Sequence, residues 1–293
     1  MEGSCSTSHF RSISLPSRLP DPAALTSIET KIKEVKARGD LVCSSETIQH
    51  GLVGLAELYV GVNELLQSPH TRQVLSRGTL VQDALEGSVV LLDSCNVLKE
   101  LIMLMKENVQ ILQSALRRKG GNLTVVNEIA TYLRSRRRVK KSIIKSLETL
   151  KSIEKKMTLI SFPDVDHHAS RVSKVLGEVN ALTIALFKTL LVFVSPKSKP
   201  VNGVQLLSKL GLKSTTSTHD KKVVVNEVQT VDMITMSLYK STRNNKMKDA
   251  DVHMTIGKLQ ILDVCIDGYE DALNCLFRIM IQNRASLLNI VVC

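Results

Sequence analysis

The chain has 293 residues and a formal net charge of +11 at pH 7. Its 43% hydrophobic and 23% charged residues are close to the averages of globular proteins, which excludes general disorder. Aromatic residues make up only 3% and Trp is absent, so the core must consist of Leu, Ile, Val and Met, a composition that favours packed helices over a β-sandwich.

Targeting and membrane signals are weak throughout the sequence. The N-terminus has no basic segment followed by an apolar run, so we expect no secretory signal. The longest apolar stretch, residues 181–194, is shorter than the roughly 20 residues that span a bilayer, and it contains Lys188, so it predicts a buried helix. The six cysteines form no CxxC pair, which favours a reducing compartment. We expect a cytoplasmic protein, with peripheral membrane association or a nuclear location as alternatives.

Residues 1–20 are rich in Ser and carry no sustained apolar period, which predicts a flexible tail. Within it, Arg11 precedes Ser14 by three residues and Pro16 follows by two. That arrangement is recognised by 14-3-3 proteins once the Ser is phosphorylated, because the phosphate binds an Arg cluster in an extended groove. The alternative is an ordinary Ser-rich leader, since short motifs arise often in such tails.

Caps and apolar spacing predict the first two helices. Asp21-Pro22 provides an N-cap followed by Pro at the first helical position, and Gly39 ends this helix. A second helix is predicted from about Ser44 to the break at Ser68-Pro69. Three glycines in it lower its helix propensity but leave room for a neighbouring helix to approach closely, namely Gly51, Gly54 and Gly61.

The strongest helical pattern runs from Val81 to Leu116. Its apolar residues advance 35 positions in ten steps, a mean of 3.5, which is the period of a coiled-coil seam. A helix that continues to Gly120-Gly121 spans about 60 Å, so we expect an elongated molecule. Further apolar residues widen the stripe and predict a central helix with two neighbours, namely Leu91, Leu101, Leu104 and Ile111.

The remaining helices are predicted between breaks rich in Gly, Pro and Ser, over residues 122–160, 164–193, 223–239 and from about 249 onward. Residues 195–222 combine Pro, Lys, Ser and Thr and are predicted to form a mobile linker. The expected fold is therefore all-α, an elongated bundle of long amphipathic helices. Residues 21–293 are predicted to form one helical-bundle domain.

Three segments carry a resemblance to a known family. They are the tail run from His9 to Arg18, the run from Gln113 to Lys119, and Leu276-Phe277-Arg278 together with residues 284–290. In these segments the chain resembles a plant family of helical proteins of unknown function that is distantly similar to BYPASS-type developmental proteins. The resemblance implies an all-α plant protein connected with root or shoot development. It implies no catalytic residues.

Enzyme signatures are missing from the sequence. There is no G-x-S-x-G, Walker A, G-x-G-x-x-G or H-E-x-x-H motif, so we expect no catalytic residues and no cofactor. The segment from Asp164 to His168 contains the residue types that bind zinc. Acidic residues in the first turn of a helix also complement its dipole, and we expect no metal site there. An enzyme with an unrecognised site remains an alternative.

Positive charge is concentrated in one band, from Arg117 to Lys156. It holds 13 Lys and Arg against three acids, a net of +10, which leaves +1 for the other 253 residues. The apolar period that begins at Val126 would continue through Arg137 and Lys140, which predicts a core seam interrupted for about two turns. The candidate binding residues in this band are Arg134, Arg136, Arg137, Arg138, Lys140, Lys141 and Lys145.

Four interpretations of the basic band compete. The band pairs with the protein's own acids, for example the column Asp263, Asp267 and Asp271, or it binds an anionic membrane surface or an acidic protein. Nucleic acid binding is the third, which the scarcity of aromatic residues argues against, and a nuclear localisation signal is the fourth. The favoured hypothesis is a non-enzymatic helical scaffold or adaptor that docks through a basic helical face. The alternative is a nucleic-acid-associated or nuclear protein.

Overall fold

The computed structural model describes residues 21–39, 44–76, 80–118, 122–158, 167–196, 226–244 and 246–292. Helices account for 94% of the described residues and none of these residues is in a strand, which confirms the all-α prediction. The helices are α1 (Asp21–Gly39), α2 (Ser45–Leu66), α3 (Pro69–Leu75), α4 (Leu80–Arg117), α5 (Asn122–Thr158), α6 (His167–Val194), α8 (Glu227–Arg243) and α9 (Asp249–Val292).

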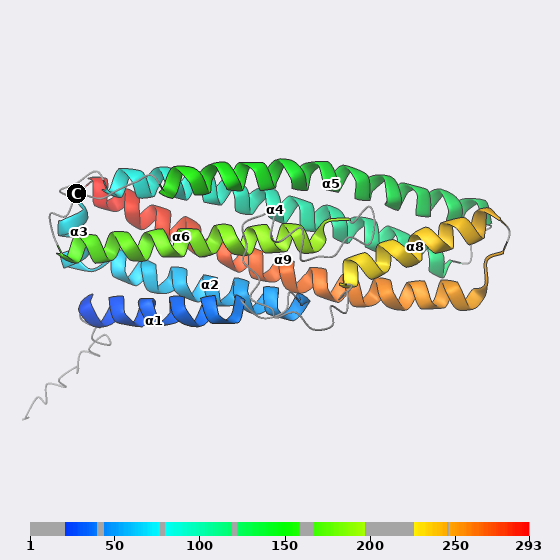
Figure 1. Ribbon diagram of the computed structural model, residues 1–293, viewed down its shortest axis with the longest axis horizontal. Coiled ribbons are helices and arrows are strands. Elements are labelled where there is room, and N and C mark those ends of the chain that lie inside the picture. The colour runs from blue at the N-terminus through cyan, green and yellow to red at the C-terminus, as the bar shows by residue number, and fades with distance from the viewer. Residues whose placement is uncertain are drawn as a thin grey trace, which may run out of the picture.

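The long helices lie side by side along one axis and form an elongated bundle (Figure 1). α9 extends along nearly the whole bundle and packs against α4, α2 and α8. α1 and α2 lie along the lower edge of the bundle in the left half of the view, α9 continues that edge on the right, and α5 lies along the upper edge (Figure 1). One continuous apolar core joins all these helices.

Serine side chains start two of the helices. The Ser44 side chain accepts a hydrogen bond from the Thr47 backbone N–H at 3.2 Å and caps α2, as the predicted boundary requires. The Ser68 side chain accepts from the Thr71 backbone N–H at 3.1 Å, with Pro69 in the first turn. A short helix, α3, therefore begins at the predicted break Ser68-Pro69. This helix was not among those predicted from the sequence.

The seam predicted on α4 lies in the core at almost every position from Val81 to Leu116, although Val89 is exposed. α4 packs against α5, α6 and α9, so it is central as predicted, with three neighbours instead of two. The stripe is narrower than predicted. Leu104 and Ile111 are 38% and 45% exposed, because no described helix covers that side of α4.

The glycines of α2 face neighbouring helices at close range. A Cβ atom at Gly61 would lie 3.2 Å from Ile28 Cγ1 on α1, and one at Gly51 would lie 2.7 Å from Leu186 Cδ2 on α6. Side chains at these positions would displace Leu186 and Ile28 from their present positions. The prediction that these glycines permit close helix approach is confirmed.

α6 is a strongly apolar helix. By length and composition alone it is the one helix of the described chain that meets the requirement for a membrane span, and half of the qualifying window is buried inside the bundle. Its one Lys within that apolar stretch, Lys188, is 2% exposed, and its Nζ forms an ion pair with Glu154 Oε2 on α5 at 2.5 Å. The stretch is thus a core helix in this arrangement, as its composition predicted.

Candidate anion-docking face on α5 and the buried Arg136 network

The buried face of α5 is continuous through the basic band. It includes Val125, Ile129, Tyr132, Arg136, Val139 and Ile143. The predicted seam through Arg137 and Lys140 is wrong by one residue. In the observed register a single cation, Arg136, enters the core instead of two, and the apolar period is not interrupted for two turns.

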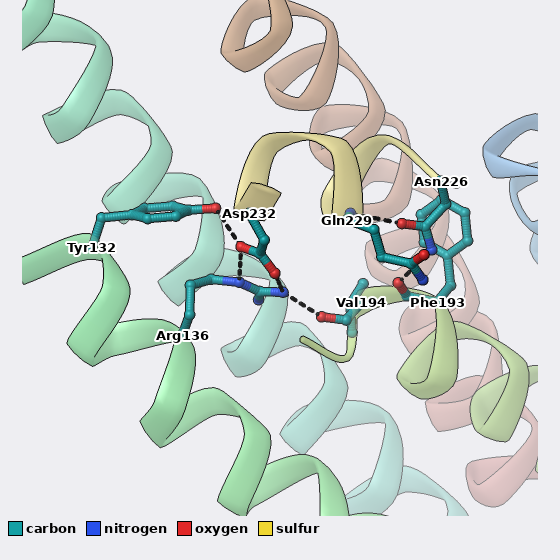
Figure 2. Close-up of polar contacts among 7 residues, drawn as sticks. All are labelled: Tyr132, Arg136, Phe193, Val194, Asn226, Gln229 and Asp232. Atoms are coloured by element: carbon teal, nitrogen blue, oxygen red, sulfur yellow. Dashed lines mark hydrogen bonds and ion pairs between the residues drawn. The ribbon is translucent and has the colours of Figure 1, made fainter. Parts of the chain in front are cut away.

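Arg136 is 4% exposed, and it joins three helices (Figure 2). Its Nε lies 2.8 Å from Asp232 Oδ1 and its Nη2 lies 2.9 Å from Asp232 Oδ2, so the guanidinium binds the α8 carboxylate through two parallel hydrogen bonds. Nη2 also donates to the carbonyl oxygen of Val194, the last residue of α6, at 2.9 Å. That carbonyl has no partner within its own helix, and a cation complements the negative end of the helix dipole.

Tyr132 completes this network, because its hydroxyl donates to Asp232 Oδ1 at 3.1 Å (Figure 2). Burial raises the pKa of Tyr132 well above its ordinary value, and the Asp232 charge adds to that effect. Burial by itself lowers the pKa of Arg136, but the Asp232 carboxylate outweighs it and the pKa is raised overall. The network therefore consists of the Arg136–Asp232 ion pair and the protonated Tyr132 hydroxyl that donates to it.

The buried position of Arg136 corrects its assignment to the candidate binding residues. Its charge is neutralised by Asp232 inside the bundle, so it is not available to an external anion. The interpretation of the band as an internal partner is therefore right for Arg136.

A second polar contact ties the start of α8 to the end of α6 beside this network. The Asn226 side chain caps α8 by accepting from the Gln229 backbone N–H at 2.8 Å. Its Nδ2 donates to the carbonyl oxygen of Phe193 at 2.9 Å (Figure 2). The last carbonyls of α6 are thus bound by an asparagine and an arginine from two other segments.

The acidic column on α9 does not pair with the basic band. Lys106 Nζ on α4 lies 2.8 Å from Asp267 Oδ1 and 2.7 Å from Glu270 Oε2, and these two carboxylates raise the pKa of Lys106. Asp263 accepts a hydrogen bond from Gln110, also on α4, at 3.4 Å. The column therefore faces α4, and its proposed pairing with α5 is wrong.

Five of the seven candidate cations lie on the solvent side of α5. All five side chains are exposed, and none forms an ion pair with a residue that the structure describes. We call this set the outer basic face. It consists of Arg134, Arg137, Arg138, Lys141 and Lys145. Their spacings of three, four and seven residues place them on one helix face. Arg134 Nη2 donates to Thr131 Oγ1 at 2.9 Å. The sixth candidate, Lys140, is half-buried and is not part of this face.

The outer basic face forms a row along the edge of the bundle. Lys145 lies eleven positions after Arg134, which corresponds to about 17 Å along the helix. Ile144 lies beside this row and is 48% exposed. The arrangement presents five cations and one large apolar side chain to the same side of the molecule.

Other candidate features fall partly or wholly outside the described residues. Arg11, Ser14 and Pro16, and most of the proposed linker, lie there, so the 14-3-3 motif and the domain division stay predictions. Of the segment 164–168, only the two histidines are described, and His168 Nε2 lies 3.1 Å from Thr71 Oγ1. No group of three metal-ligating side chains occurs in the part of the chain that the structure describes.

A family model described as "Protein BPS1" matches residues 51–290. The chain belongs to the BPS1 family. The match confirms the resemblance to BYPASS-type plant proteins and includes two of the three segments that indicated it, while the tail run 9–18 lies before its first residue. Membership of the BPS1 family suggests a plant developmental protein. No curated protein and no solved structure matched the chain.

Proposed function

We propose that this BPS1-family protein is a non-enzymatic helical adaptor, active in root or shoot development, that docks on an anionic membrane surface through the outer basic face. The observation that carries the proposal is the row of five exposed cations that form no ion pair with the described residues. Each Lys or Arg close to an anionic leaflet contributes about 1 kcal/mol, so five contribute about 5 kcal/mol before other costs.

Two features favour a membrane over an acidic protein partner. The row lies on α5, a long helix at the edge of the elongated bundle (Figure 1). A row of cations on one face of such a helix suits a flat anionic surface. Ile144, 48% exposed beside them, supplies an apolar group that enters the headgroup region when the cations bind. An acidic protein partner remains an outcome of the test below.

Nucleic acid is a weaker candidate for the same face. Proteins that bind single strands stack bases on aromatic side chains between the cations. The one aromatic residue in the stretch 132–145 is Tyr132, which is 3% exposed and bound to Asp232. The face therefore offers charge but no stacking surface.

Vesicle co-sedimentation tests the proposal with the whole chain. The triple variant Arg137→Gln/Arg138→Gln/Lys141→Gln removes three exposed charges without touching the core. We expect wild type to bind phosphatidylcholine vesicles that contain about one-third phosphatidylserine, and the variant to bind roughly two orders of magnitude more weakly, since three charges contribute about 3 kcal/mol. Binding should fall as salt is raised.

A matched control removes three charges elsewhere. Lys33, Lys174 and Lys258 are exposed, lie on α1, α6 and α9, and form no ion pair with a described residue. Their replacement by Gln should leave vesicle binding within about threefold of wild type, because these charges lie on other helices and are not part of the outer basic face. Equal losses of vesicle binding in the two triple variants would mean that binding depends on net charge and not on the outer basic face. If the wild-type protein does not bind acidic vesicles at low salt, the membrane proposal is wrong and an acidic protein becomes the remaining partner.

A further inference from the structure

The solvent side of α4 carries two columns of exposed residues, each with a repeat of seven. The apolar column consists of Val90, Val97, Leu104 and Ile111. Its four side chains are between 37% and 45% exposed. The acidic column consists of Glu86, Asp93, Glu100 and Glu107, all of them exposed and without an ion pair to a described residue. Together the two columns advance in alternating steps of four and three, the spacing that lets another helix pack along their whole length.

These two columns lie on the same side of the bundle as cations of the outer basic face. A groove between α4, α5 and α6 is lined by Glu86 and Val90, the first members of the two columns, and by Ser152 of α5. Lys145 and Arg138 precede Ser152 by seven and fourteen residues, so they continue its column along α5. The face that α4 and α5 form together therefore presents carboxylates and apolar side chains on α4 and cations on α5.

The acidic column and these cations also lie at the same level along the bundle. Only four residues separate the end of α4 from the start of α5, and the two helices pack together, so they run antiparallel. Val90 and Thr149 line the same groove and are therefore about level with each other. Three positions after Val90 and three before Thr149, Asp93 is level with the neighbour of Lys145. The next members of both columns, seven residues further on, are level again.

Charge decides how a second copy of the chain fits on this face. If α4 lay against α4 of the second copy, carboxylates would face carboxylates, which opposes association. A twofold axis parallel to the bundle instead lays α4 of each copy on α5 of the other and leaves every residue at its own level. The acidic column of each copy then meets the cations of its partner, so the complementary contact is made twice, with the apolar columns beside it.

We infer that the face formed by α4 and α5 binds a second copy of this chain, in a twofold-symmetric dimer that pairs the acidic column of each copy with Arg138, Lys141 and Lys145 of the other. The columns extend over 25 positions, about 37 Å, and two adjacent helices are about 20 Å wide, so the face covers about 750 Å². A standard specific interface buries a similar area, about 800 Å² per partner. The dimer does not depend on membrane docking, but it covers cations of the outer basic face, so one copy cannot make both contacts at once.

Sedimentation velocity of the whole chain at low ionic strength tests the inference with two charge reversals. The acid-reversed variant is Asp93→Lys/Glu100→Lys/Glu107→Lys, and the base-reversed variant is Arg138→Glu/Lys141→Glu/Lys145→Glu. We expect wild type to sediment as a dimer and each variant alone as a monomer, because like charges then meet at both contacts. An equimolar mixture of the two variants should sediment as a dimer again, since opposite charges face each other at both contacts of the mixed pair.

Glu34→Lys/Glu64→Lys/Asp271→Lys provides the matched control for the acid-reversed variant. The three acids are exposed, lie on α1, α2 and α9, and form no ion pair with a described residue, and their reversal changes the net charge by the same amount. This control should sediment as a dimer, and circular dichroism of all variants should show the wild-type helix content. A monomeric wild type, a monomeric control or a mixture that stays monomeric overturns the inference. Because no vesicles are present, these outcomes are independent of membrane docking.

Discussion

The guanidinium of Arg136 on α5 and the carboxylate of Asp232 on α8 are joined by two hydrogen bonds, Nε to Oδ1 at 2.8 Å and Nη2 to Oδ2 at 2.9 Å. The Arg136 side chain is 5% exposed and that of Asp232 17%, so water screens the pair little. The same Nη2 reaches the end of α6 through the Val194 carbonyl oxygen. This one side chain therefore fixes the mutual positions of three helices.

We expect Asp232→Ala to destabilise the protein by about 3 to 5 kcal/mol, because it leaves a buried guanidinium without its counter-charge. Urea denaturation followed by circular dichroism measures the change. Arg137→Ala, one residue along at an exposed position, should change stability by less than about 0.5 kcal/mol. The double variant Arg136→Met/Asp232→Leu should recover part of the loss, since an apolar pair replaces the ionic one but leaves the Tyr132 hydroxyl and the Val194 carbonyl oxygen without these partners. A loss below about 1 kcal/mol for Asp232→Ala would mean that water reaches Arg136.

Alkaline pH should destabilise the bundle through its buried tyrosines. Burial raises the pKa of Tyr59 from 10.0 to about 12, and burial also raises the pKa values of Tyr132 and Tyr269. In the unfolded chain these groups lose their protons near pH 10, before the folded ones do. Their contribution is therefore complete below pH 10 and is lost as the pH rises through the folded-state values. For Tyr59 the difference corresponds to about 3 kcal/mol.

Tyrosinate absorbance near 295 nm, recorded together with circular dichroism, tests this pH dependence. The three buried tyrosines should ionise well above pH 10 and together with the loss of helix. In concentrated urea they should ionise near pH 10. Ionisation of all three near pH 10 while the helical signal is intact would contradict the prediction.

The helices were predictable because the sequence repeats their periodic signal many times. The seam on α4 carries apolar residues at ten successive steps. Capping residues mark the starts of other helices, namely Asp21, Ser44 and Asn122. The apolar period and the capping residue together indicate where such a helix begins. α3 was missed because seven residues are too few for a period, and the Pro that begins it also signals a break.

The role of Arg136 was not predictable, because its partner is 96 residues away in the sequence. On α5 the buried stripe could start at Val125 or at Val126, and each of these two stripes is about half apolar. Sequence periodicity alone does not decide between them. An exposed position for most of the basic band was one of the alternatives that the sequence left open, because so many cations outnumber what one core position can hold.

The ion pair between Lys188 and Glu154 should show an asymmetric response to substitution. The Lys188 side chain is 2% exposed, whereas that of Glu154 is 51% exposed. Glu154→Ala leaves a buried ammonium group that only water can bind, and we expect a loss of about 2 kcal/mol, less than for a fully buried pair. Lys188→Met removes the buried charge and fills similar space, so it should change stability by less than about 1 kcal/mol. Urea denaturation measures both variants, and a larger loss for Lys188→Met would contradict this account.

Glycines of the bundle should respond to substitution according to the space beside them. A Cβ atom at Gly61 would lie 3.2 Å from Ile28 Cγ1, so the branched side chain of Gly61→Val would overlap α1 and should cost about 1 to 3 kcal/mol. Gly257 has no atom within 4 Å of such a position, and Gly257→Ala should stabilise α9 by about 0.5 to 1 kcal/mol. Thermal unfolding followed at 222 nm compares the two. Trimming the partner in Gly61→Val/Ile28→Ala should recover part of the loss, because the two residues share one contact. If Gly61→Val is as stable as wild type, α1 does not pack on α2 as closely as the 3.2 Å approach requires.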